Sequence, residues 1–114
     1  VLKWLDEHPD VIWYSSEEII VPYRSPVDGK VHRYFPDFVV KVRSRNGLER
    51  TMMLEIKPQY QTQKPAKKSR VTKKYIQEVV TWSVNNAKWE AAQEYCLDRG
   101  WDFKILTEID LKIK

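Results

Sequence analysis

The chain has 114 residues, a length that fits one domain with a single modest hydrophobic core. Hydrophobic residues make up 42% of it and aromatic residues 12%, which excludes a disordered chain, because disordered chains have little apolar surface to bury. No apolar run approaches the roughly 20 residues that cross a bilayer, so we expect no membrane partner. The net charge of +4 and the pI of about 9.2 are compatible with a nucleic-acid partner without requiring one.

The predicted elements begin with a helix over residues 1–7, which ends before Pro9. An alternating pattern predicts a strand over 18–24, and the Pro, Asp and Gly content of 25–29 predicts a turn. Residues 31–42 are rich in β-branched and aromatic side chains and predict a second strand. The remaining elements, in order, are a hairpin turn around Asn46-Gly47, a third strand over 51–57, a polar loop over 58–65, two helices over 69–85 and 88–99, a stop at Gly100, a strand over 101–106 and a short helix capped by Thr107.

This order predicts a mixed α/β fold in one domain, residues 1–114. Three strands form an antiparallel meander, and the last strand has to cross back over the helices to rejoin the sheet. The single cysteine, Cys96, cannot form an internal disulfide and falls among apolar residues of a predicted helix. We therefore expect a buried, reduced thiol and a cytoplasmic setting.

Three residues of the predicted meander could carry phosphodiester chemistry: Asp37, Glu55 and Lys57. Such hydrolysis needs a metal ion held by carboxylates, a nucleophilic water, and a cation near the charge that develops on phosphorus. Side chains alternate along a strand, so Glu55 and Lys57 share one face. The alternative interpretation is a weak ion pair on the solvent-facing side of the strand.

The register of the hairpin decides whether Asp37 joins this pair. In an antiparallel pair, the numbers of opposed residues have a constant sum. A sum of about 92 places Asp37 opposite Glu55, whereas a strict two-residue Asn-Gly turn gives roughly 93 and places it opposite Ile56. The active-site hypothesis therefore requires a hairpin loop of odd length or a bulge near Asp37.

A basic tract follows the third strand without any acidic residue to interrupt it. We predict that it contacts DNA phosphates, although a solvated loop and helix face is the alternative. Lys88 and Asn85 are further candidates for phosphate contacts from the helices. The predicted DNA-binding residues are Lys64, Lys67, Lys68, Arg70, Lys74 and Lys88.

Several other polar and aromatic residues have simpler explanations than catalysis. His32 could lie near a metal, but a hydrogen-bonded strand histidine is the favoured interpretation. Trp82 and Trp89 lie on the apolar sides of their helices and are expected in the core rather than as platforms for bases. Gln77 could approach the site from its helix.

The chain carries four longer motifs, HRYFPDF at 32–38, LEIKP at 54–58, TWSVNNAKW at 81–89 and GWDFKILTE at 100–108. These motifs resemble the head completion nucleases of T-even-type bacteriophages and, more distantly, the end-cleaving endonuclease subunits of some transposons. This likeness implies a restriction-endonuclease-like fold of the PD-(D/E)XK class. It implies Mg²⁺ as cofactor, with Mn²⁺ as a substitute, bound by Asp37 and Glu55, and catalysis by both together with Lys57. It also implies DNA processing at the filled capsid, with portal or neck proteins as partners.

One feature of that family has no match here. Its members usually carry another acidic metal ligand in a helix before the first strand, and the corresponding glutamate would lie upstream of Val1. If the chain is a fragment, metal binding is expected to be weaker. Glu7, Glu17 and Glu18 are possible substitutes, but Glu17 and Glu18 are explained more simply as a pair at a strand edge.

Three functions therefore remain open from the sequence. The leading one is a Mg²⁺-dependent DNA endonuclease of phage head completion. The second is a transposon- or junction-type DNA endonuclease subunit, and the third is a catalytically inactive DNA-binding virion protein. The presence of Asp37, Glu55 and Lys57 favours the two enzymes.

Overall fold

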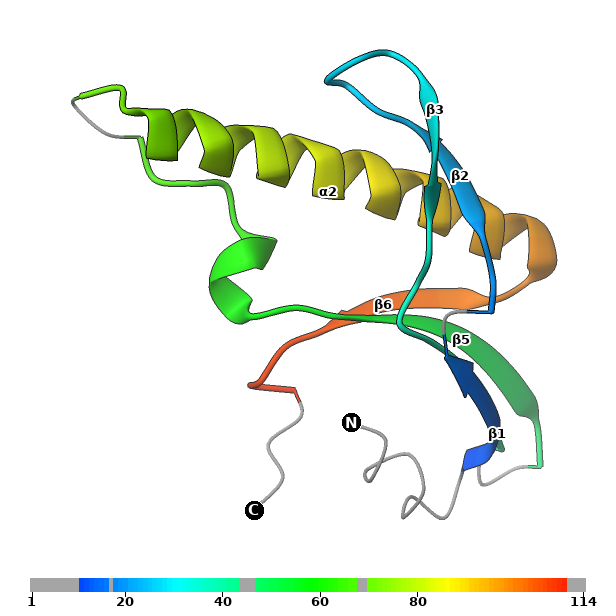
Figure 1. Ribbon diagram of the computed structural model, residues 1–114. Helices are drawn as coiled ribbons and strands as arrows, with labels where there is room; N and C mark the ends of the chain where they lie inside the picture. Colours follow the sequence, from blue (N-terminus) through cyan, green and yellow to red (C-terminus); the bar gives the residue numbers. More distant parts are fainter. Residues whose placement is uncertain (1–10, 17, 44–46, 68–69, 111–114) are drawn as a thin grey trace.

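The computed structural model describes residues 11–16, 18–43, 47–67 and 70–110. The predicted helix over residues 1–7, Asn46 of the predicted turn, and Lys68 lie outside this part of the chain. The elements, shown in Figure 1, are β1 (Val11–Ser16), β2 (Val21–Arg24), β3 (Val31–Tyr34), β4 (Phe38–Arg43), β5 (Glu49–Ile56), the 3₁₀ helix η1 (Gln59–Thr62), α2 (Lys73–Arg99) and β6 (Asp102–Leu106).

The main sheet has four strands in the order β1-β4-β5-β6. The first three are antiparallel to one another, whereas β6 is parallel to β5. A parallel neighbour requires a crossover connection, which α2 supplies. The predicted mixed α/β fold with a crossover strand is therefore confirmed.

The predicted meander is wrong in its first two strands, those over 18–24 and 31–42. Residues 31–42 do not form one strand, because the chain leaves β3 after Tyr34 and enters β4 at Phe38. Pro36 lies in this break, where its fixed φ and missing N–H interrupt a ladder. β3 pairs with β2 as a separate two-stranded sheet, and β4 pairs instead with β1, a strand that the sequence pattern did not predict.

The two helices predicted over 69–85 and 88–99 are one continuous helix, α2. Neither Asn85 nor Asn86 ends it, and the side chain of Asn86 donates to the carbonyl of Trp82 at 2.8 Å within the helix. The helix begins at the cap residue Thr72, whose hydroxyl accepts from the Tyr75 N–H. It ends at Gly100, as predicted, with φ at 70°.

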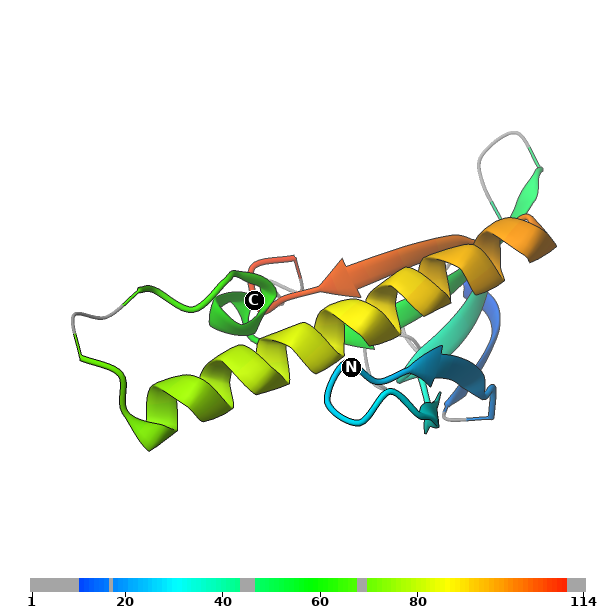
Figure 2. The same cartoon turned by 90° about the horizontal axis from the view of Figure 1, so that it is seen from above.

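Helix α2 packs against the main sheet with its C-terminal half. There, buried Trp89, Ala92 and Cys96 meet Val39 and Met53, and the Sγ of Cys96 lies 3.8 Å from the Sδ of Met53. Burial raises the pKa of the Cys96 thiol to about 11, so the predicted buried thiol is confirmed. Figure 2 shows that the N-terminal half of the helix extends beyond the sheet. No helix in the described ranges is long and apolar enough to cross a membrane.

The two faces of the main sheet carry different residues. Phe38, Val40 and Leu54 form a second apolar cluster, separate from the cluster of Val39 and Met53 that meets α2. Because side chains alternate along a strand, the position before Phe38 and the position after Leu54 return to the helix side. These positions are Asp37 and Glu55.

Candidate active site

The register between β4 and β5 brings Asp37 and Glu55 to opposite positions. Phe38 pairs with Leu54, and each further pair down to Arg43 and Glu49 keeps the same sum of 92. The last pair is Arg43 with Glu49, which leaves residues 44–48 between them, an odd number that excludes a two-residue turn. The register that the active-site hypothesis requires is confirmed.

Glu55 is a buried carboxylate, with 6% of its surface exposed. Its Oε2 accepts a short hydrogen bond from the Tyr34 hydroxyl, and its Oε1 lies 3.6 Å from the Nζ of Lys57. Burial raises the pKa of Glu55, and the nearby charge of Asp37 raises it further, while Tyr34 and Lys57 act in the opposite direction. The carboxyl group is thus held in a fixed orientation, at an energetic cost for its ionised form.

Asp37 is anchored to the end of β5 by its own side chain. Its Oδ2 accepts from the backbone N–H of Ile56 at 2.7 Å, which leaves Oδ1 for another partner. The β4–β5 register places Asp37 opposite Glu55, and the charge of Asp37 contributes to the raised pKa of Glu55. Two carboxylates therefore converge where β5 ends.

Lys57 follows directly after β5 and keeps the ammonium group beside Glu55. Its side chain is 27% exposed, so the cation is accessible from solvent while the glutamate is not. The backbone N–H of Lys57 donates to the carbonyl of Leu106 at 3.0 Å, which extends the contact with β6. The structure thus places Asp37, Glu55 and Lys57 together.

Tyr34 also belongs to this site, although the sequence pattern did not predict it there. Burial raises the pKa of the Tyr34 hydroxyl, and the bond to Glu55 raises it further, so it stays protonated and acts as a donor. The Nζ of Lys88 stands 5.8 Å from the ring centroids of both Tyr34 and Tyr23. Tyr34 lies in the same motif as Asp37, but its contact depends on how the β2–β3 hairpin folds over the sheet.

The remaining predicted site residues lie outside the carboxylate pair. His32 bonds to Asp28 at 2.8 Å on the exposed hairpin, as the favoured interpretation expected. Trp89 is buried in the core as predicted, but Trp82 is only partly buried and lines a cavity. Glu18 is exposed. Glu7 and Glu17 lie outside the described residues.

The described residues of the basic tract are exposed along the loop after η1 and at the start of α2. Within the described ranges, none of them forms an ion pair with an acidic side chain that would neutralise it. Such a cluster of accessible cations can contact a phosphate backbone. The exposed members are Lys64, Lys67, Arg70, Lys73 and Lys74.

The chemistry of the carboxylate pair fits a hard divalent cation. Mg²⁺ prefers oxygen ligands and usually takes one or two protein carboxylates beside waters and substrate phosphates. Across the part of the chain that the structure describes, no group of three or more histidine, cysteine or acidic side chains comes together that could hold a metal. Asp37 and Glu55 could therefore hold such an ion with an incomplete protein shell, which leaves room for water and phosphate.

Comparisons with known proteins relate the chain to nucleases. The model of a family described as "TnsA-like endonuclease N terminal" matches residues 8–108. The head completion nuclease of Enterobacteria phage T4 is 42% identical over 114 residues, which cover 96% of this chain and 73% of that protein. No solved structure gives a significant match. Both resemblances expected from the motifs are therefore confirmed.

Proposed function

The chain belongs to the family of TnsA-like endonucleases, and from that premise we propose that it cleaves DNA with Mg²⁺ bound by Asp37 and Glu55. Membership confirms the predicted enzyme class, a DNA endonuclease, and the restriction-endonuclease-like fold. The observation that carries the proposal about the site is the convergence of Asp37, Glu55 and Lys57 at the end of β5.

Asp37 and Glu55 would hold Mg²⁺, which when bound would make a water molecule more acidic and would neutralise charge on the phosphate. Asp37 and Glu55 must both be ionised to hold the ion. The Lys57 ammonium, beside Glu55 and open to solvent, provides positive charge where the pentacoordinate phosphorus gains negative charge. The Tyr34 hydroxyl keeps one oxygen of Glu55 turned toward it and so fixes the rotamer of the carboxylate.

The raised pKa of Glu55 predicts how metal affinity changes with pH. Mg²⁺ competes with a proton for this carboxyl, so the Mg²⁺ concentration for half-maximal cleavage should fall as pH rises above the ordinary range of a glutamate. A titration of cleavage with Mg²⁺ at several pH values measures this.

The same shift has a consequence for the protein without metal. The folded state binds the proton of Glu55 more tightly than the unfolded state, so its stabilising contribution is present at low pH and is lost as pH rises through the folded pKa. Urea unfolding without metal should show this loss, and Glu55→Gln should remove that part of the pH dependence. An identical pH dependence in wild type and variant would contradict the assignment.

The basic tract predicts a binding contribution that is independent of sequence. Replacing Lys64 and Lys67 with alanine should weaken binding to unrelated DNA sequences equally and reduce the slope of log K against log salt by about 0.9 for each phosphate that the protein no longer neutralises. The matched control is the double variant in which Lys30 and Lys104, also exposed lysines, are replaced with alanine. Equal salt slopes for the two double variants would assign the tract to a solvated surface.

The biological role that we propose is phage head completion, supported by the 42% identity to the T4 head completion nuclease. Such a role places the protein in the cytoplasm of the bacterial host or on the virion, with DNA and portal or neck proteins as partners. The family match supports a second candidate, cleavage at transposon ends or junctions. Restoration of infectivity to a phage that lacks its own head completion nuclease would support the first, and only site-specific cleavage of transposon ends would support the second.

A further inference from the structure

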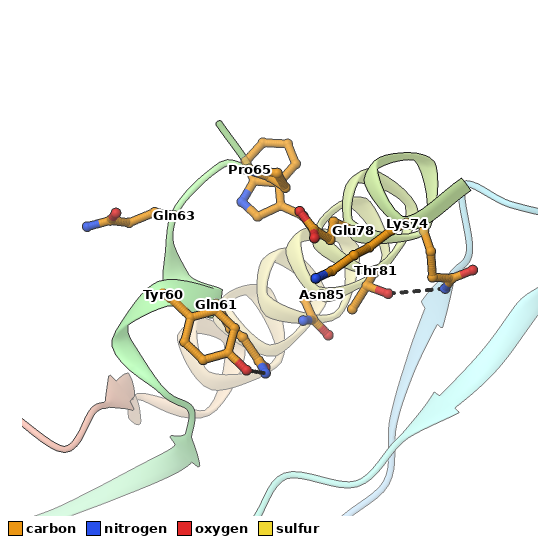
Figure 3. A pocket seen from close by; sticks show the side chains of 10 residues that line it. Tyr60, Gln61, Gln63, Pro65, Lys74, Glu78, Thr81 and Asn85 are labelled. Carbon is orange, nitrogen blue, oxygen red and sulfur yellow. Dashed lines mark hydrogen bonds between the residues drawn. The ribbon is translucent and has the colours of Figure 1, made fainter. Parts of the chain in front are cut away.

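A cavity of about 590 Å³ lies between η1 with the loop after it and the N-terminal half of α2. Figure 3 shows its two walls, with Tyr60 and Gln61 on the side of η1 and Lys74, Thr81 and Asn85 on α2. Its volume falls within the range of sites that bind small organic groups, roughly 300–1,000 Å³. Nothing in the catalytic mechanism uses it.

Asn85 presents a side-chain amide to the cavity without a protein partner among the described residues. The residue is 7% exposed and lines the cavity, and no residue of the described ranges forms a hydrogen bond with its side chain. Its neighbour Asn86, by contrast, bonds to the carbonyl of Trp82. Because this amide is accessible from the cavity, a ligand that offers both a donor and an acceptor could pair with its oxygen and its NH₂ group. The edges of nucleobases offer both.

Tyr60 supplies a flat apolar surface at the rim of the same cavity. The residue is 74% exposed, and its hydroxyl accepts from the Nε2 of Gln61 at 3.0 Å, which holds the side chain in place. An exposed aromatic ring beside a basic groove is the usual platform on which a base of a single strand stacks. Both Lys74 and Glu78 line the cavity, so its charge is mixed and suits an uncharged base better than a phosphate.

The cavity adjoins the catalytic residues at both walls. η1 begins at Gln59, two positions after Lys57. On α2, Asn85 and Lys88 are three residues apart and so lie on one face, and Lys88 stands over the ring of Tyr34, which bonds to Glu55. A nucleotide in the cavity would therefore neighbour the nucleotide at the carboxylates.

We propose that this cavity binds the base of an unpaired nucleotide beside the cleaved bond, so that the preferred substrate is DNA with a single-stranded segment at that point. A base inside a duplex is stacked and paired and cannot enter such a cavity without leaving the helix. This inference rests on the proposed function, because it places the unpaired strand relative to Asp37 and Glu55. The sugar-phosphate backbone would lie outside, along the basic tract.

The test is binding of a DNA duplex with a single-stranded tail, measured by fluorescence anisotropy in EDTA so that no cleavage occurs. Abasic nucleotides are placed at successive tail positions. At one position the missing base should weaken binding to the wild type by about 5- to 100-fold, the value of one stacked base. Tyr60→Ala should bind intact tailed DNA more weakly than the wild type by a similar factor, and its affinity should not depend on where the abasic nucleotide lies. Tyr60→Phe keeps the ring and should behave as the wild type.

The control protein is Leu97→Ala, which removes an exposed apolar side chain from the other end of α2. The proposal would be overturned if the wild type bound the tails with equal affinity whatever the abasic position. It would also be overturned if Tyr60→Ala still distinguished abasic from intact tails as strongly as the wild type does. Cleavage of plain duplex and of tailed DNA in Mg²⁺ is measured in parallel. Failure of the wild type to cleave either plain duplex or tailed DNA would refute the proposed function, whereas the binding result stands or falls separately because it needs neither metal nor catalysis.

Discussion

Glu55→Gln and Asp37→Asn should each lower Mg²⁺-dependent DNA cleavage about a thousandfold or more under single-turnover conditions. A metal ion contributes several kcal/mol to stabilising the charge of the transition state, and each ~1.4 kcal/mol corresponds to a factor of ten. An amide oxygen is a weaker ligand for Mg²⁺ than a carboxylate. Each variant removes one of the two carboxylates that converge at the end of β5.

Both amide variants are expected to fold. The glutamine oxygen can still accept from Tyr34, and the asparagine oxygen can still accept from the Ile56 N–H. The repulsion between the two carboxylates also disappears, so stability without metal should be equal or higher. Glu49→Gln, on the exposed end of the same strand, is the matched control and should retain activity. Normal cleavage by Glu55→Gln or Asp37→Asn would remove that residue from the active site.

Lys57→Ala should lower kcat by about a hundredfold to a thousandfold, the usual cost of losing one donor near developing charge. The substrate KM should change little, because the interaction strengthens in the transition state. Lys57→Arg keeps the charge but changes its geometry, so it should recover part of the rate.

The assay for Lys57 has to be done at saturating Mg²⁺. The ammonium lowers the pKa of Glu55, so its removal also strengthens proton competition at the metal site. Lys104→Ala, an exposed lysine on β6, is the control for the removed charge. A variant of Lys57 whose entire defect disappears at high Mg²⁺ would show that the lysine only tunes metal binding.

The placement of the trio Asp37, Glu55 and Lys57 together at the end of β5 was predictable because it depends on local rules. The period of two along β5 puts Glu55 and Lys57 on one face, and a single hairpin fixes the position of Asp37 relative to them. The odd hairpin loop could not be chosen from local turn preference alone, because Asn46-Gly47 also favours a two-residue turn. The requirement that two carboxylates share one metal ion selected the correct register.

The environment of the trio depends on tertiary packing and was not predictable in the same way. Tyr34 reaches Glu55 only because the chain breaks at Pro36 and β2–β3 leaves the main sheet. Likewise, α2 continues through Asn85 and Asn86, residues with modest helix propensity, where packing of the following turns against the sheet outweighs the local preference.

The cavity was not predicted either. It forms between η1 and a part of α2 that extends beyond the sheet, so its walls come from segments that no short-range pattern relates. Trp82 was expected in the core and instead lines this space. Trp82 follows the apolar pattern of the helix, but it belongs to the N-terminal half of α2, which extends beyond the sheet.

The most direct test of the metal site is anomalous X-ray diffraction from crystals of the protein soaked in Mn²⁺, which substitutes for Mg²⁺ and scatters more strongly. We predict one anomalous peak between Asp37 and Glu55, within about 2–2.3 Å of a carboxylate oxygen of each, and no such peak in Glu55→Gln. Occupied Mn²⁺ sites elsewhere, with none between these two carboxylates, would contradict the proposal that they hold the catalytic metal.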